Sequence, residues 1–231
     1  MIYEDLLKQY EELTEEEKNI LLVYKSRLGR AINSLNNNDS EIKEIYERYK
    51  CLVENPQNIF IKFSVFKDIS FKSLEEFIES LLNVKEKLDK ISSKIILSQD
   101  ITVYRAFSIR DDKELISISK SNLVSTSLDI NECSKYIIPN KGFTHYLYQI
   151  NLEKGSMIAI CPYRILIDNN DRLVLTKEND SKEIILSKDN FDFEEVEKTE
   201  STFNNNEKLN IISIAAKSKK IVTDINNKKQ K

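Results

Sequence analysis

The sequence is poor in the residues on which several common functional sites depend. Its three glycines, Gly29, Gly142 and Gly155, are far apart, which excludes a glycine-rich loop that cradles phosphate groups. Three cysteines without CxxC spacing and one histidine are too few and too scattered for a structural zinc site, which takes about four nitrogen or sulfur ligands. We therefore expect reduced cysteines and no metal.

Long apolar runs and a strong net charge are also missing. No apolar run approaches the ~18 residues that a membrane-spanning helix needs, and the N-terminal segment MIYEDLLKQYEELTEEEK has no apolar stretch of the signal-peptide kind. The 35 basic and 38 acidic residues leave a net charge of -3, so there is no general attraction to nucleic acid or to anionic membranes. We expect a soluble protein that neither binds nucleic acid nor inserts into a membrane.

The two parts of the chain differ in hydrophobic periodicity. Up to about residue 97 apolar residues recur at helical spacing, and the capping box of Thr14 and Glu17 opens what we predict to be one long helix to Leu35. Ser40 and Ser73 are the predicted caps of two further helices. Short runs of β-branched and aromatic residues then predict strands at 102–107, 123–127, 144–152, 157–160, 173–176, 183–186, 191–196 and 209–215, with short helices at 111–119 and 131–138.

This order of elements predicts an α+β fold, because helices come first and strands afterwards. We expect a single domain over residues 1–216, with a helical lobe at 1–97 and a β-rich core at 98–216. Residues 217–231 are basic and poor in apolar side chains, so we expect a flexible tail.

Polar residues stand at strand ends where apolar residues would pack at lower cost. Arg105 follows Val103 and Tyr104, Ser125-Thr126-Ser127 follows Leu123 and Val124, and Glu183 precedes a run of three apolar residues. A buried charge without a partner costs several kcal/mol. These side chains must therefore satisfy one another or line a cleft. Each alone also fits a structural role, and His145, in an alternating strand, is interpreted as structural.

Five segments in this order resemble the ADP-ribosyltransferase exoenzyme family, most closely the enzymatic component of clostridial binary toxins. They are the helical lead-in LTEEEKNILLVYKSRLGRAINSL, the arginine strand VYRAF, the strand LVSTSL, the segment YQINLEKGS and the glutamate strand SKEIILSKD. The resemblance covers about Leu13 to Ala215. It implies a split β-sandwich with an N-terminal helical lobe around a cleft that holds NAD.

The resemblance also implies roles for individual residues. Arg105 is expected to bind the NAD phosphates, since its planar guanidinium suits an anion. Ser125 is expected to orient the catalytic Glu183, which stabilises the positive charge as the bond to nicotinamide breaks. Thr126 and Ser127 are expected to support the strand and the nicotinamide-ribose side of the pocket. Lys141 and Tyr24 are further candidates for contact with NAD.

The chain departs from the family pattern two positions before the glutamate. Family members carry glutamate or glutamine there, a residue thought to activate the acceptor, and this chain has Ser181. Glu178 or Asp180 would then reach the acceptor, or the acceptor needs no such base.

The implied activity is transfer of ADP-ribose from NAD to a target protein with release of nicotinamide. Two alternatives stay open: an NAD glycohydrolase that uses water, and a catalytically silent adaptor of the same fold. The implied partners are the target protein and a carrier or delivery component, with secretion or delivery into a host cell.

Overall fold

The computed structural model describes residues 2–26, 28–35, 38–53, 66–110, 118, 121–137, 142–167, 173–177, 182–203 and 207–219. The chain forms two compact units. The strand unit comprises Met1–Leu7, Ser92–Ile160 and Asn179–Lys231, and the helical unit comprises Lys8–Ile91 and Cys161–Glu178. The fold class is α+β, as the order of elements in the sequence predicts.

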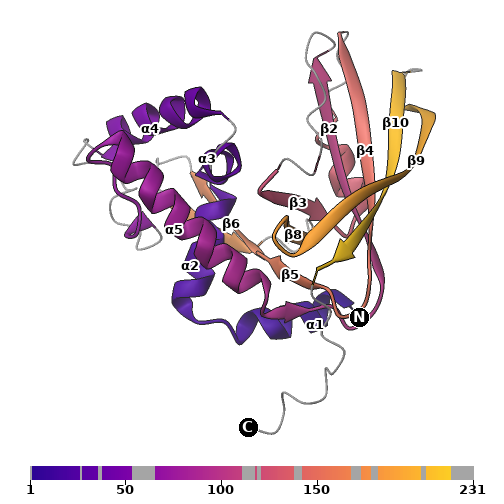
Figure 1. The fold of residues 1–231 in the computed structure, drawn as a ribbon, viewed down its shortest axis with the longest axis horizontal. Coiled ribbons are helices and arrows are strands. Elements are labelled where there is room, and N and C mark those ends of the chain that lie inside the picture. The colour runs from indigo at the N-terminus through magenta and orange to yellow at the C-terminus, as the bar shows by residue number, and fades with distance from the viewer. Residues whose placement is uncertain are drawn as a thin grey trace, which may run out of the picture. The chain divides into compact units, whose positions relative to one another are not determined.

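Amphipathic helices and one hairpin build the helical part of the chain (Figure 1). The helices are α1 (Ile2–Glu11), α2 (Glu15–Lys25), α3 (Leu28–Ser34), α4 (Asp39–Val53) and α5 (Leu74–Ser92), and the hairpin is β6 (Tyr163–Ile167) with β7 (Leu173–Lys177). The first residues of α1, up to Leu7, belong to the strand unit. The hairpin strand β6 packs against α2. Apolar side chains at helical spacing form the core of this unit, among them Ile20, Leu21, Leu28, Ile32, Phe77, Leu81 and Leu88.

The predicted long helix is wrong, because Ser26 divides it into α2 and α3. The backbone of Ser26 is extended, with ψ 178°. Its hydroxyl donates to the carbonyl of Val23 at 2.6 Å and accepts from the N–H of Leu28 at 3.2 Å. Ser26 therefore ends one helix and caps the next, while the apolar spacing on which the prediction rested continues on both sides of it.

Two of the three predicted helix starts are confirmed. Thr14 Oγ1 accepts from the N–H of Glu17 at 3.3 Å, and Glu17 Oε2 accepts from the N–H of Thr14 at 3.0 Å. Ser73 Oγ accepts from the N–H of Glu76 at 3.1 Å. The cap at Ser40 is wrong: α4 begins at Asp39, and the Asn38 side chain accepts from the N–H of Glu41 at 3.2 Å.

The strand unit contains an eight-stranded sheet in the order β1-β5-β8-β3-β2-β4-β10-β9. Its strands are β1 (Ile95–Ile96), β2 (Ile101–Arg110), β3 (Leu123–Ser127), β4 (Phe143–Leu152), β5 (Met157–Ile160), β8 (Glu183–Ser187), β9 (Phe191–Phe203) and β10 (Glu207–Ser218). Every predicted strand is present, and the sequence missed only the short β1 and β6 among the described strands. The strand β10 continues to Ser218, two residues beyond the predicted boundary of the core.

The sheet is nearly divided between β2 and β3. β2 pairs with β4 along its whole length, and β3 pairs with β8 along its whole length, but β2 and β3 share only the pair of Tyr104 and Ser127. The two halves of the sheet therefore separate at this point, which we call the seam. The seam accounts for the expected split of the sheet into two parts.

A short helix supports β2 beside the seam. α6 (Ile130–Ser134) follows β3, and its Cys133 lies in a buried cluster with Ala106, Leu147 and Leu209. Cys133 Sγ lies 3.1 Å from the carbonyl oxygen of Tyr104, and burial raises the pKa of this thiol. Tyr104 and Ala106 thus face α6, and the alternation of a strand turns the intervening Arg105 to the other face of the sheet. The helix predicted at 111–119 lies outside the described residues except for Ile118.

At the start of α3, replacing Gly29 by alanine is expected to lower the stability of the protein. A Cβ added at Gly29 would lie 2.1 Å from the carbonyl oxygen of Tyr24, so the backbone would have to move. We expect Gly29→Ala to destabilise the protein by about 1–3 kcal/mol, whereas the same change in an unstrained helix stabilises by about 0.4–1 kcal/mol. Thermal and urea unfolding measure the difference, and a raised midpoint for Gly29→Ala would contradict this close contact.

Candidate active site

The centre of the candidate site is a side-chain hydrogen bond between β3 and β8. Ser125 Oγ donates to Glu183 Oε1. The register places Ser127 opposite Glu183 and Ser125 opposite Ile185, so Ser125 is the diagonal neighbour of Glu183 on the same face of the sheet. Pairing of the two strands therefore brings together residues that lie far apart in the sequence.

Arg105 joins this pair from across the seam. Its Nη1 donates to the main-chain carbonyl of Ser125 at 3.0 Å. Ser125 thus contacts both of the other residues, the arginine through its carbonyl group and the glutamate through its hydroxyl group. The structure brings Arg105, Ser125 and Glu183 into one cluster, which we call the seam triad.

The surroundings of the triad hold the Glu183 carboxylate in a fixed orientation. Glu183 is only 7% exposed, and Ser125 and Arg105 are partly buried. A buried carboxylate loses most of its hydration, so a hydrogen bond from a neighbouring hydroxyl contributes more there than it would in water. The guanidinium adds a positive charge that stays protonated at any pH relevant to proteins.

The other two residues of the serine-threonine-serine segment fasten the strands. Thr126 is 4% exposed and projects from the opposite face of β3, where its Oγ1 donates to the carbonyl of Ile184 at 2.8 Å. Ser127 Oγ accepts from the N–H of Asp129 at 2.9 Å. These contacts fix the C-terminal end of β3, directly after Ser125.

The backbone just before Glu183 has an uncommon conformation. Lys182 has φ 38°, in the left-handed region, and its carbonyl accepts from the N–H of Leu128 at 3.3 Å. A side chain at positive φ is disfavoured outside glycine and asparagine-like residues. The entry of β8 is therefore held in a specific geometry next to the buried glutamate.

The remaining candidates are not part of the described cluster. Tyr24 lies on α2 in the helical unit and is buried. Lys141, Glu178, Asp180 and Ser181 lie outside the described residues. His145 is buried, and its Nδ1 lies 2.9 Å from the hydroxyl oxygen of Ser108, which agrees with the structural interpretation.

An aromatic cluster beside Arg105 was not predicted from the sequence. The ring of Phe107 lies 6.0 Å from the guanidinium carbon of Arg105, stacks on Tyr146 and meets Tyr148 edge-on. Burial raises the pKa of the Tyr148 phenol, as does Glu195, while Arg105 opposes this shift. The i, i+2 spacing of Arg105 and Phe107 predicts that they share a face of the strand. Their contact with Tyr146 and Tyr148 depends on the pairing of β2 with β4, which the local sequence does not reveal.

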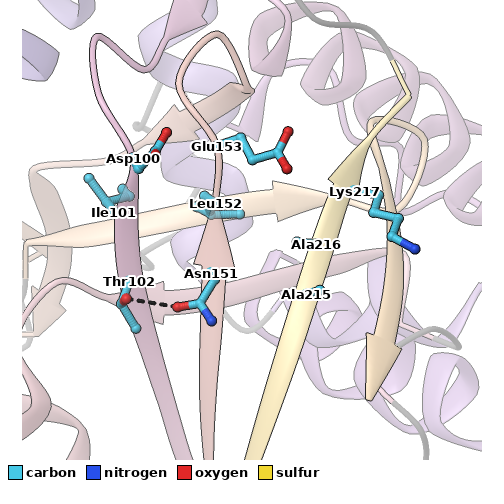
Figure 2. Close-up of a pocket in the computed structure, with 9 residues that line it drawn as sticks. All are labelled: Asp100, Ile101, Thr102, Asn151, Leu152, Glu153, Ala215, Ala216 and Lys217. Atoms are coloured by element: carbon cyan, nitrogen blue, oxygen red, sulfur yellow. Dashed lines mark hydrogen bonds between the residues drawn. The ribbon is translucent and has the colours of Figure 1, made fainter. Parts of the chain in front are cut away.

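A separate hollow lies at the far end of the same strands. It has a volume of about 410 Å³ and is lined by residues 100–102, 151–153 and 215–217 (Figure 2). Thr102 Oγ1 donates to Asn151 Oδ1 at 2.8 Å on its wall. None of the predicted site residues lines this hollow, so it is distinct from the seam triad.

Metal and membrane features are not found in the described part of the chain. Its histidine, cysteine, aspartate and glutamate side chains form no group of three or more that could hold a metal ion. Among the same residues, no helix combines the length and the apolar character needed to cross a membrane.

Comparison with solved structures identifies the fold. Plx2a, an ADP-ribosyltransferase toxin from Paenibacillus larvae, superposes with a TM-score of 0.56 at 14% identity, over 93% of this chain and 92% of that chain. Vis toxin, an ADP-ribosyltransferase from Vibrio splendidus, gives 0.52 at 11% identity, over 93% and 82%. The enzymatic component C2-I of the C2-toxin from Clostridium botulinum gives 0.51 at 16% identity, over 96% of this chain and 47% of that chain.

No family model matches the sequence, and no curated protein matches it. The similarity is therefore one of structure at low sequence identity. The chain has the fold seen in ADP-ribosyltransferase toxins, as the resemblance implied.

The bond that fastens β3 to β8 yields a stability prediction. Replacing Thr126 by valine keeps the side-chain shape and leaves the buried carbonyl of Ile184 without this donor, so we expect a loss of about 1–3 kcal/mol. The matched control is Thr102→Val, which removes a solvent-exposed bond of 2.8 Å from a partly buried threonine and should cost less than about 0.5 kcal/mol. Equal unfolding midpoints for the two variants would contradict the role of Thr126.

Proposed function

We propose that the protein is a mono-ADP-ribosyltransferase that transfers ADP-ribose from NAD to a target protein and releases nicotinamide. The observation that carries the proposal is the seam triad, in which a buried glutamate receives a hydrogen bond from Ser125 while Arg105 donates to the same serine. The fold of the chain, shared with ADP-ribosyltransferase toxins, supports the same reaction class.

The side chains of the triad fit the chemical groups of NAD. A guanidinium presents several donors in a plane and suits the pyrophosphate, which carries the negative charge of the dinucleotide. A carboxylate suits the ribose next to nicotinamide, because it accepts hydrogen bonds from hydroxyl groups and attracts positive charge. Arg105 and Glu183 therefore offer the two complementary ends of one site, with Ser125 between them.

The proposed reaction breaks one bond and forms one. NAD supplies an ADP-ribosyl group joined to a positively charged nicotinamide, which leaves as a neutral molecule with the bonding electron pair. Glu183 stabilises the positive charge that develops on the ribose, and Ser125 holds its carboxylate in position. A nucleophilic atom of the acceptor then bonds to the ribose carbon and loses its proton to solvent or to a nearby base.

A carboxylate oriented in advance is the main contribution of the chain to this step. Fixed charges in a site that excludes water stabilise a transition state more strongly than mobile ones, because they need no reorganisation as the reaction proceeds. The hydrogen bond from Ser125 and the low exposure of Glu183 supply these two conditions.

The acceptor side of the site is part of the proposal. Ser181 stands where related enzymes place a glutamate or glutamine, and Asp180 and Glu178 are the nearest preceding carboxylates in the sequence. We propose this segment as the contact with the acceptor protein. Lys141 and Tyr24 are proposed as further contacts with NAD, and Thr126 and Ser127 as supports of the pocket.

A delivery component is the second proposed partner. C2-I is the enzymatic component of the C2-toxin, and a separate component that delivers this chain into a host cell would be its counterpart. Secretion or delivery is the localisation that follows from the proposed activity.

Ser181 also favours a second candidate function, hydrolysis of NAD with water as the acceptor. Without a residue that activates a protein side chain, the same cleavage of the nicotinamide bond leads to free ADP-ribose. Nicotinamide release without added protein, compared with labelling of a host-cell lysate by biotinylated NAD, separates the two reactions.

The test of the proposal uses Glu183→Gln, which keeps the shape of the side chain and removes its charge. We expect nicotinamide release to fall by about 100-fold or more, while NAD affinity changes by less than a few fold, because the lost interaction forms mainly in the transition state. The matched control is Glu197→Gln, an exposed glutamate on β9, which should keep wild-type activity.

Two results would overturn the proposal. A folded wild-type protein that binds NAD without releasing nicotinamide, alone or in lysate, would favour the adaptor. An active Glu183→Gln variant would remove Glu183 from the reaction.

A further inference from the structure

We propose that Lys182 is a positioning residue for Glu183, and that it acts through its left-handed backbone rather than through its ammonium group. This inference rests on the proposed function and adds to it a residue that acts through the glutamate. Among the non-glycine residues that the structure describes, only Lys182 has a positive φ, 38°. It directly precedes Glu183, the first residue of β8.

The left-handed conformation is unfavourable for a lysine. At positive φ the Cβ atom of an L-residue lies too close to the following carbonyl oxygen. Glycine adopts this region readily, and asparagine does so more often than most other residues. A residue of another type stays there only if the surrounding structure holds it. Contacts with the neighbouring strand must therefore keep Lys182 in place.

A main-chain hydrogen bond to the end of β3 supplies this contact. The carbonyl of Lys182 accepts from the N–H of Leu128 at 3.3 Å, one position beyond the register pair of Ser127 and Glu183. The carbonyl thus extends the pairing of β3 with β8 by one residue past the glutamate. A φ of 38° at Lys182 also turns the preceding chain away from the direction of an extended strand.

The backbone of Glu183 is consequently anchored on both sides. The carbonyl of Lys182 is tied to the chain after β3, and the carbonyl of Ile184 accepts from Thr126 Oγ1 at 2.8 Å. Without the first anchor, Glu183 would be the free end of a strand, and free ends fray. The two anchors therefore fix the backbone from which the carboxylate reaches the Ser125 hydroxyl.

The proposed reaction depends on where this carboxylate lies. A misplacement of about 1 Å in an active site can cost on the order of 100-fold in rate. The carboxylate stabilises charge that develops in the transition state, so its displacement should lower kcat and leave the KM for NAD nearly unchanged. An ammonium group that acted through its charge would not depend on the backbone conformation. This difference separates the two roles that Lys182 can have.

The experiment compares Lys182→Asn with Lys182→Val. Both remove the ammonium group, but asparagine tolerates positive φ, whereas a β-branched side chain does not. We expect Lys182→Val to lower the kcat of nicotinamide release by about 10- to 100-fold, with a KM for NAD within about threefold of wild type. Lys182→Asn and Lys182→Gly should keep kcat within about twofold. Rates are expressed per NAD-binding site, counted by isothermal titration calorimetry, so that unfolded protein does not lower the measured kcat.

The same two variants in a Glu183→Gln background show whether Lys182 acts through the glutamate. With the charge of the carboxylate removed, valine and asparagine at position 182 should give residual rates within about twofold of each other. A general structural effect of the valine would lower the rate by the same factor in both backgrounds, and that result would contradict the positioning role.

The remaining outcomes separate this role from the proposed function. Equal rates for Lys182→Val and Lys182→Asn in an active protein overturn the role of Lys182 alone: two wild-type rates would show that the left-handed backbone is dispensable, and two lowered rates would assign the effect to the ammonium group. A folded wild type that releases no nicotinamide overturns the proposed function and this role together. If Lys182→Val does not fold, Lys182→Ala replaces it, and a kcat equal to that of Lys182→Asn overturns the role.

Discussion

The bond from the Ser125 hydroxyl to the buried Glu183 carboxylate is the interaction on which the proposed chemistry depends. A carboxylate that is 7% exposed is stable in that position only if neighbouring groups compensate for lost hydration. The hydroxyl supplies part of this compensation and also orients the carboxylate. Since Thr126 fastens β3 to β8 on the opposite face, the two strands hold the serine and the glutamate at a defined separation.

The divided sheet explains how a charged arginine reaches this pair. β2 and β3 share a single register pair, so no continuous ladder of main-chain pairs joins these two strands. Beside this pair, Arg105 donates to the Ser125 carbonyl at 3.0 Å, while α6 covers the other face of β2 through Cys133 and its apolar neighbours. Two residues further along β2, Phe107 packs against Tyr146 and Tyr148 of β4. One interruption of regular pairing thus lies where a guanidinium reaches the serine–glutamate pair.

Much of this arrangement was predictable from the sequence. The strands follow from period-2 runs, and the triad was predicted because polar residues at strand ends need partners and because the segments resemble a known family. Other features depend on tertiary register. The sequence does not reveal that Phe107 stacks on Tyr146, since their pairing depends on β2 and β4 lying side by side. The division of the first helix at Ser26 was missed because serine is tolerated within helices and the apolar spacing continues across it.

The central claim is that Ser125 and Glu183 act as one unit, and a double-mutant cycle on nicotinamide release tests it most directly. The rates of wild type, Ser125→Ala, Glu183→Gln and the double variant would be compared at saturating NAD. If the serine acts by orienting the carboxylate, the double variant should be about as active as Glu183→Gln alone, because the serine has no charge left to orient. Independent effects, in which the two losses multiply in the double variant, would contradict the account.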